Sequence, residues 1–137
     1  MSKRRYHNPD ALHKNPAFSQ GVSVPSTART IYVGGQNAIA ADGSLVGGDD
    51  LAAQTMKSLQ NLQTILADAG ATIHDVVKWN ILILAGQPAN EGFEAFKSVW
   101  GQDANPPAIT IAFVSGFAVP GALVEIDAIA VIDVDEH

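Results

Sequence analysis

Two long apolar segments constrain the fold of this chain more than any other feature. "VVKWNILIL" (residues 76–84) and "ALVEIDAIAVI" (122–132) are rich in β-branched residues and too apolar for surface helices. We predict that both are strands of a sheet with helices on one face. With residues 31–33 they carry more apolar side chains than one covered face can absorb, so we expect further copies of the chain to bury the other face.

Two other stretches have the apolar spacing of helices. Residues 50–69 can begin at an Asp49 or Asp50 cap and end at Gly70, and residues 90–100 repeat the pattern up to Gly101. After the first helix, Thr72 is predicted to cap a turn that contains residues 74 and 75.

The remaining strands are predicted from short β-rich runs and turn signals. Residues 18–24 and 30–36, followed by a tight turn at Asp42 and Gly43, are expected to form one meander. Pro106 and Pro107 forbid a helix and lead into "AITIAFV". Alternating strands and helices indicate an α+β sandwich in which two helices cover one face of the sheet.

Length and charge limit the organisation and the partners. The 137 residues fit one domain, predicted at 17–133, with a flexible N-terminal tail at 1–16 and a C-terminal tail at 134–137. A net charge of −6 disfavours nucleic-acid binding, although Lys3, Arg4 and Arg5 make the first residues basic. Neither a membrane span nor a signal peptide is recognisable, so a cytoplasmic protein is expected.

No cofactor or metal is predicted. There is no cysteine, His7 and His13 are poorly spaced for a metal, and His137 ends the sequence. The "VSGFAVPG" segment around Ser115 lacks the glycine spacing of a phosphate loop.

Several motifs occur in a fixed order from Phe18 to Ile132: "AFSQGVSV", "IYVGGQ", the first helix with its exit "AGATIHDVVK", "NPPAIT" and "LVEIDAIAVI". On these motifs the chain resembles the RidA (YjgF) family. The resemblance implies a chorismate-mutase-like fold, a homotrimer whose sheets line a central barrel, and ligand clefts between neighbouring subunits. In active members the cleft hydrolyses imines or enamines made from amino acids.

The resemblance also assigns site positions, most of which have changed here. The family's arginine, which implies a clamp for a substrate carboxylate, falls on Ile109. Its tyrosine falls on Phe18, its serine on Gly34 and its asparagine on Lys97, while Glu125 is unchanged. The chain is therefore identified as a divergent member that lacks the catalytic arginine.

These changes make part of the expected cleft apolar. Strand alternation adds Ile111 and Phe113 to the wall that contains Ile109. An ionised carboxylate left unpaired against such a wall would cost on the order of several kcal/mol, and Lys97 alone could offset that cost.

Three charged residues have both a functional and a structural interpretation. Glu125 lies on the opposite strand face from Val124 and Ile126, where it either serves the cleft as a general acid or base or is simply exposed. Lys97 either replaces the clamp or is a solvated helix residue. Arg29 either contacts ligand or is a solvated turn residue.

Three functions remain open from the sequence. The leading hypothesis is a homotrimer that binds a small, uncharged or apolar metabolite and has lost imine deaminase activity. The second is a deaminase or other hydrolase of an imine or enamine, with Glu125 positioning water. The third is a protein interaction module without a small-molecule ligand.

Overall fold

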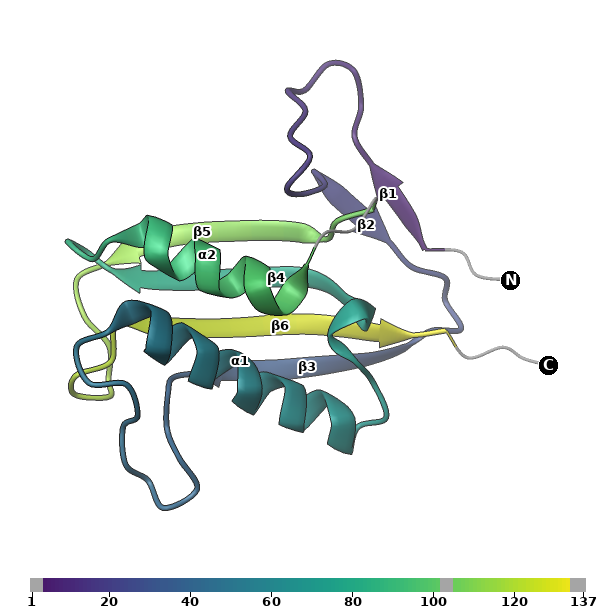
Figure 1. Cartoon of the computed structure of the whole chain (residues 1–137). Helices are drawn as coiled ribbons and strands as arrows, with labels where there is room; N and C mark the ends of the chain where they lie inside the picture. Colours follow the sequence, from purple (N-terminus) through teal and green to yellow (C-terminus); the bar gives the residue numbers. More distant parts are fainter. Residues whose placement is uncertain (1–3, 102–104, 134–137) are drawn as a thin grey trace.

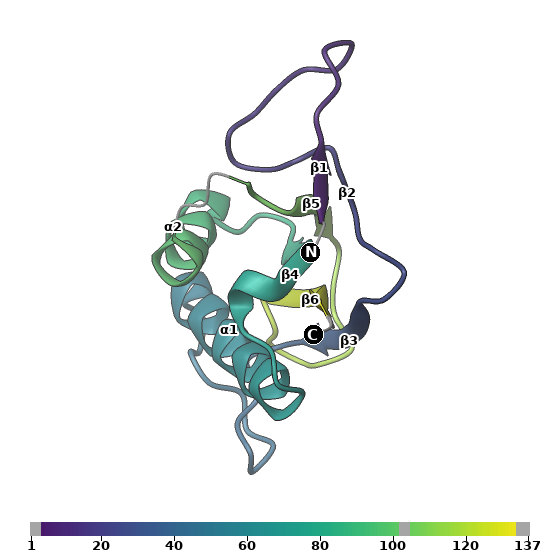
Figure 2. The same cartoon turned by 90° about the vertical axis from the view of Figure 1, so that its right-hand side faces the viewer.

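A mixed four-stranded sheet carries two helices on one face. In the computed structural model, which describes residues 4–101 and 105–133, the strands are β3 (Arg29–Gln36), β4 (Val76–Leu84), β5 (Ala108–Val114) and β6 (Val124–Ile132). Their order is β3-β6-β4-β5, and β5 runs parallel to β4 while the other neighbours are antiparallel. Figures 1 and 2 show both helices on the same side of this sheet, as predicted.

The helices begin and end close to the predicted residues. Helix α1 (Leu51–Asp68) starts at Asp50, whose carboxylate accepts the amide of Ala53 at 3.2 Å, and α2 (Ala89–Trp100) ends at Gly101, where φ is 77°. Between α1 and β4, the short 3-10 helix η1 (Ile73–Asp75) has a capping box formed by Thr72 and Asp75. The predicted Thr72 cap is thus confirmed.

The register of the strands divides the sheet into two faces. Trp79 of β4 is paired with Ala128 and Ile109, so this row lies on one face; the next rows on that face contain Ile81 and Ile83. The helices cover this face, and its β4 and β6 side chains are buried.

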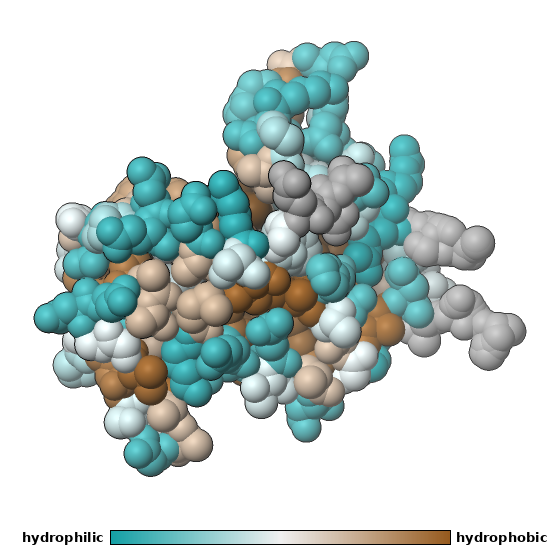
Figure 3. Space-filling view, viewed as in Figure 1, coloured by the Kyte–Doolittle hydropathy of each residue, from teal (hydrophilic) through white to brown (hydrophobic). Residues whose placement is uncertain are grey.

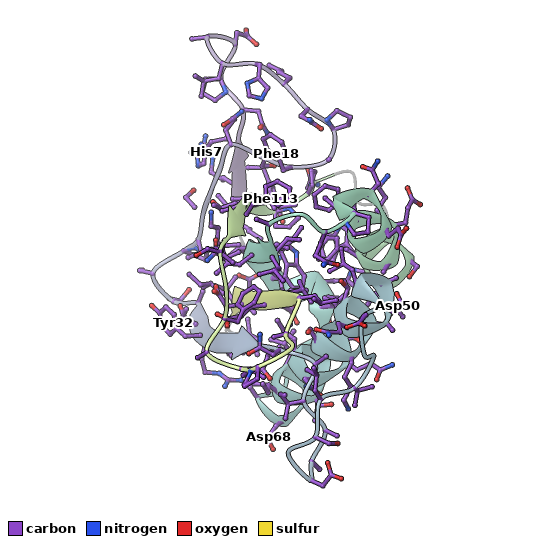
Figure 4. The ribbon with its side chains drawn as sticks, turned by 90° about the vertical axis from the view of Figure 1, so that its left-hand side faces the viewer. His7, Phe18, Tyr32, Asp50, Asp68 and Phe113 are labelled. Carbon is purple, nitrogen blue, oxygen red and sulfur yellow. The ribbon has the colours of Figure 1, made fainter. Side chains whose placement is uncertain are left out.

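The other face is open to solvent and mixed in character. One row of this face pairs Tyr32 with Ile129 and Ile129 with Lys78, and Tyr32 is 77% exposed and points away from the helices (Figure 4). The row beside it contains Asp127, which accepts a hydrogen bond from Asn80 at 3.2 Å. The open face is therefore less apolar than the sequence analysis expected, because most apolar residues of β4 and β6 point to the helices.

A separate two-stranded arm differs from the prediction. Strand β1 (Arg5–His7) pairs with β2 (Gly21–Ser23), and the arm, residues 4–23, projects from one end of the sheet (Figure 1). Part of the predicted N-terminal tail is thus a strand, and β2 and β3 do not form a meander, because β3 pairs with β6. Residues 1–3 and the predicted C-terminal tail at 134–137, with His137, lie outside the described residues.

The predicted tight turn lies in a long connection between β3 and α1. Ala40 donates its amide to the carbonyl of Ser44, and an isolated bridge joins Ile39 to Leu45.

None of the helices among residues 4–101 and 105–133 is long and apolar enough to cross a membrane.

Candidate functional site

An open cleft of about 1130 Å³ lies between the arm, α2 and β5. Three structural parts make its wall: residues 14–18 of the arm, one side of α2, and the helix-side residues of β4 and β5. Beyond these parts, Asn8, Ser19, Gly101 and Pro106 complete the lining. In Figure 3, hydrophobic side chains show between the more hydrophilic outer surfaces of the helices.

The wall from α2 is aromatic because these side chains recur at helical spacing. Phe93, Phe96 and Trp100 line the cleft, and the last two are largely buried. Behind them lies Trp79, fully buried, with its ring centroid 5.0 Å from Phe96 and 6.0 Å from Trp100 in edge-on contacts. This packing fixes the aromatic wall to the core of the domain.

The wall from the sheet is aliphatic. Ile81 of β4 and Ile109 and Ile111 of β5 face the same side, and Ile111 is 44% exposed. Within the described residues that line the cleft, the positive groups are Lys14 and Lys97.

The arm is fixed to the edge of β5 beside the cleft. Buried Ser19 donates its amide to the carbonyl of Pro107 at 2.9 Å and its hydroxyl to the carbonyl of Pro106 at 2.6 Å. Phe18, the neighbouring residue, is thereby held at the cleft, with its ring against that of His13.

Four of the eight predicted site residues come together in this cleft: Phe18, Lys97, Ile109 and Ile111. Phe113 lies on the same strand face but is 57% exposed and does not line the cleft.

The remaining three predicted residues lie elsewhere in the chain. Arg29 donates to the carbonyl of Ala69 at 3.2 Å and so serves the C-terminus of α1. Gly34 is exposed on β3. Glu125 is paired with Leu82, which is paired in turn with Ala112, so its carboxylate lies on the open face, opposite Ile109.

Glu125 lies on the open face beside β3. Its side chain is half-buried and lies against Gly35, and within the described part of the chain no side chain donates a hydrogen bond to it. Elsewhere in the chain, the Ser44 hydroxyl and then the Ser44 amide donate to the carboxylate of Asp42 and lower the pKa of that carboxyl. Asp42 does not line the cleft.

Sequence reasoning missed two contributions to this cleft. Phe93 and Trp100 follow the apolar spacing of the predicted helix and pack in or against the core, and their spacing with Lys97 also places all three along the side of α2 that lines the cleft. Lys14 and Asn8 gave no signal, because they belong to a segment predicted as a flexible tail.

Comparison with known proteins agrees with this fold. The sequence model of the family described as endoribonuclease L-PSP matches residues 8–132. A Rid-family protein of unknown function from Yersinia pestis is 36% identical, with a TM-score of 0.80 over 94% of this chain and 98% of that one. No curated protein matches the chain in sequence.

Two further solved structures are similar over most of their length. A putative endoribonuclease from Thermotoga maritima is 29% identical, with a TM-score of 0.68 over 91% of both chains. RidA from the Antarctic bacterium Psychrobacter is 27% identical, with a TM-score of 0.65 over 91% of this chain and 94% of that one.

Proposed function

Because the chain belongs to the endoribonuclease L-PSP family, which includes the RidA and YjgF proteins, we propose that it binds a small, uncharged or apolar metabolite in clefts between the subunits of a homotrimer. The observation that carries the proposal is the side chain of Ile109. It lines the cleft together with Ile111, Phe93 and Trp100. None of these four can neutralise an anion.

The cost of desolvation decides which ligands suit this wall. An ionised carboxylate held against it without a cation would lose several kcal/mol, whereas an apolar ring gains about 25 cal/mol for each Å² of apolar surface removed from water. The cleft volume of about 1130 Å³ is ample for a ligand of one or two rings. We therefore assign the wall to an apolar ligand body.

Two ammonium groups border the exposed rim of the cleft. Lys14 pairs with Asp10 at 2.8 Å, and Lys97 pairs with Glu94 at 3.9 Å, all four side chains being at least 55% exposed. Ion pairs of this kind contribute about 0–1 kcal/mol, so either lysine can exchange its partner. A polar end of the ligand would meet them only if it projects to the rim.

A second copy is needed for Glu125 to act on the same ligand. In one chain the sheet separates the Glu125 carboxylate from Ile109, because the two residues lie on opposite faces. An intersubunit cleft, in which the wall beside β5 faces the open sheet face of a neighbour, removes this separation.

A matched pair of ligands tests the proposal. Indole and indole-3-acetate have the same ring system and differ by a carboxymethyl group. We expect calorimetric titration to give binding of indole that is at least as tight as that of indole-3-acetate, because Ile109 offers the carboxylate no partner. Binding of the acetate about tenfold tighter, lost in Lys97→Gln, would show instead that the lysine has become the clamp.

Imine or enamine hydrolysis is the second candidate, favoured by the half-buried carboxylate of Glu125, which accepts no hydrogen bond from a side chain of the described residues. Glu125→Gln is nearly isosteric, so the fold should be kept. Turnover should be abolished because the amide cannot exchange a proton with water. Unchanged turnover in that variant would eliminate Glu125 as the acid or base.

The remaining functions are weaker proposals. RNA cleavage, the activity named in the description of the family, is disfavoured by the net charge of −6. A protein interaction module would be favoured if keto acids, enamines and aromatic metabolites all failed to raise the melting temperature.

A further inference from the structure

Two adjacent glycines, Gly34 and Gly35, interrupt the regular pairing of β3 with β6. The register shifts between Val33 and Gln36 at this point. Neither glycine has a positive φ, so neither adopts the left-handed conformation that favours glycine. The backbone alone thus gives no reason for a glycine at either position.

The two glycines differ in the space beside their α-carbons. A β-carbon on Gly34 would meet nothing within 4 Å, whereas one on Gly35 would stand 2.4 Å from Oε2, 2.7 Å from Cδ and 3.0 Å from Cγ of Glu125. The Glu125 side chain therefore lies directly over the α-carbon of Gly35.

A side chain at position 35 would change the place of the carboxylate more than the fold. Contacts below 3.0 Å are not tolerated, and the atom that can move is the end of a flexible side chain rather than backbone. To reach ordinary contact, which begins at 3.4 Å, Cδ of Glu125 would have to retreat by roughly 0.7 Å and Oε2 by somewhat more.

We infer that Gly35 is a positioning residue that holds the Glu125 carboxylate against β3 on the open face. Its missing side chain sets where that carboxylate stands, and Gly34 has no such role. The importance of this placement rests on the proposed function, in which Glu125 faces the cleft of a neighbouring subunit. The placement itself is a property of the free protein.

Carbon-13 NMR of the full chain tests the inference. The sequence contains four glutamates, Glu91, Glu94, Glu125 and Glu136, so labelling their side-chain carboxyl carbons gives four signals, and Glu125→Gln identifies one. Gly35→Ala should move the Glu125 signal and leave the other three in place. Gly34→Ala, the matched control, should move none. An unmoved Glu125 signal in Gly35→Ala, or an equal movement in Gly34→Ala, would overturn the inference.

A second variant covers the case in which Gly35→Ala does not fold. Glu125→Ala empties the space over Gly35, so Gly35→Ala should fold in that background, and failure in both backgrounds would overturn the inference. Because no ligand is used, a negative result here leaves the proposed function standing, and an unsuccessful ligand titration leaves the role of Gly35 intact.

Discussion

At the scale of single residues, the side chain of Ile109 decides whether the cleft wall can bind a ligand with a carboxylate. Ile109→Arg should tighten binding of indole-3-acetate about tenfold and leave indole unchanged or weaker, because the guanidinium gives the carboxylate a charge-assisted partner at the cleft wall. Calorimetric titration of both ligands measures this. Thr64→Arg, which adds the same charge at an exposed position of α1, should change neither. No gain in a correctly folded Ile109→Arg protein would mean that residue 109 is not at the ligand.

A second residue, Gln54, joins two distant loops to α1. Its fully buried side chain donates to the carbonyls of Gly48 and Gly121, at 2.7 and 3.0 Å, and accepts the amide of Leu123 at 2.9 Å. Gln54→Leu should lower the free energy of unfolding by about 2 kcal/mol, because the buried Leu123 amide loses its acceptor while the exposed glycine carbonyls can bind water. Urea unfolding measures the loss, and Gln60→Leu on the exposed side of α1 should cost far less.

At the scale of secondary-structure elements, the bounds of helices and strands were predicted well because they depend on neighbouring residues. Helix α1, expected at 50–69, spans Leu51–Asp68, and β4 and β5 have the predicted bounds. Apolar period and caps act within a few residues, so one sequence suffices to read them. Strand order is set by contacts between distant segments, and the pairing of β3 with β6 instead of β2 left no local trace.

The difference between local signals and contacts of distant segments also explains why only part of the cleft was predicted. Ile109, Ile111 and Phe18 were identified by motif and alternation, whereas Lys14 enters through the folding of the arm, which depends on Ser19 and two proline carbonyls far away in the sequence.

The attachment of the arm gives a prediction at this scale. Ser19→Ala removes the hydroxyl that binds the Pro106 carbonyl, a loss of about 1 kcal/mol, so amide exchange in β1 and β2 should speed up about fivefold. Hydrogen exchange of the Tyr6 and Val22 amides measures it. Ser26→Ala, at an exposed turn position, is the control. Unchanged exchange in the arm would mean that Ser19 does not hold it.

At the scale of the whole molecule, we expect the open sheet face to contact further copies of the chain. Tyr32, 77% exposed in the single chain, and its neighbour Ile129 give the open face an apolar area beside Lys78 of β4, which suits a specific contact between copies better than free solvent. We expect light scattering at about 10 μM to give a mass of 43 kDa, three times the 14.3 kDa of one chain.

Two substitutions that add the same charge distinguish an effect on this contact from a general effect on solubility. Tyr32→Glu should dissociate the trimer, because it replaces an aromatic ring at the expected contact with a carboxylate that is costly to bury. Gln60→Glu adds the same charge to the exposed side of α1 and should leave the mass unchanged. If Tyr32→Glu dissociates the trimer, ligand binding should be lost with it, since Glu125 and Ile109 lie on opposite faces of one sheet and the proposed cleft would bring them together across two chains. A wild-type mass of 14.3 kDa, or full ligand affinity in a monomeric Tyr32→Glu protein, would refute the shared cleft and assign the ligand to the groove beneath the arm of a single subunit.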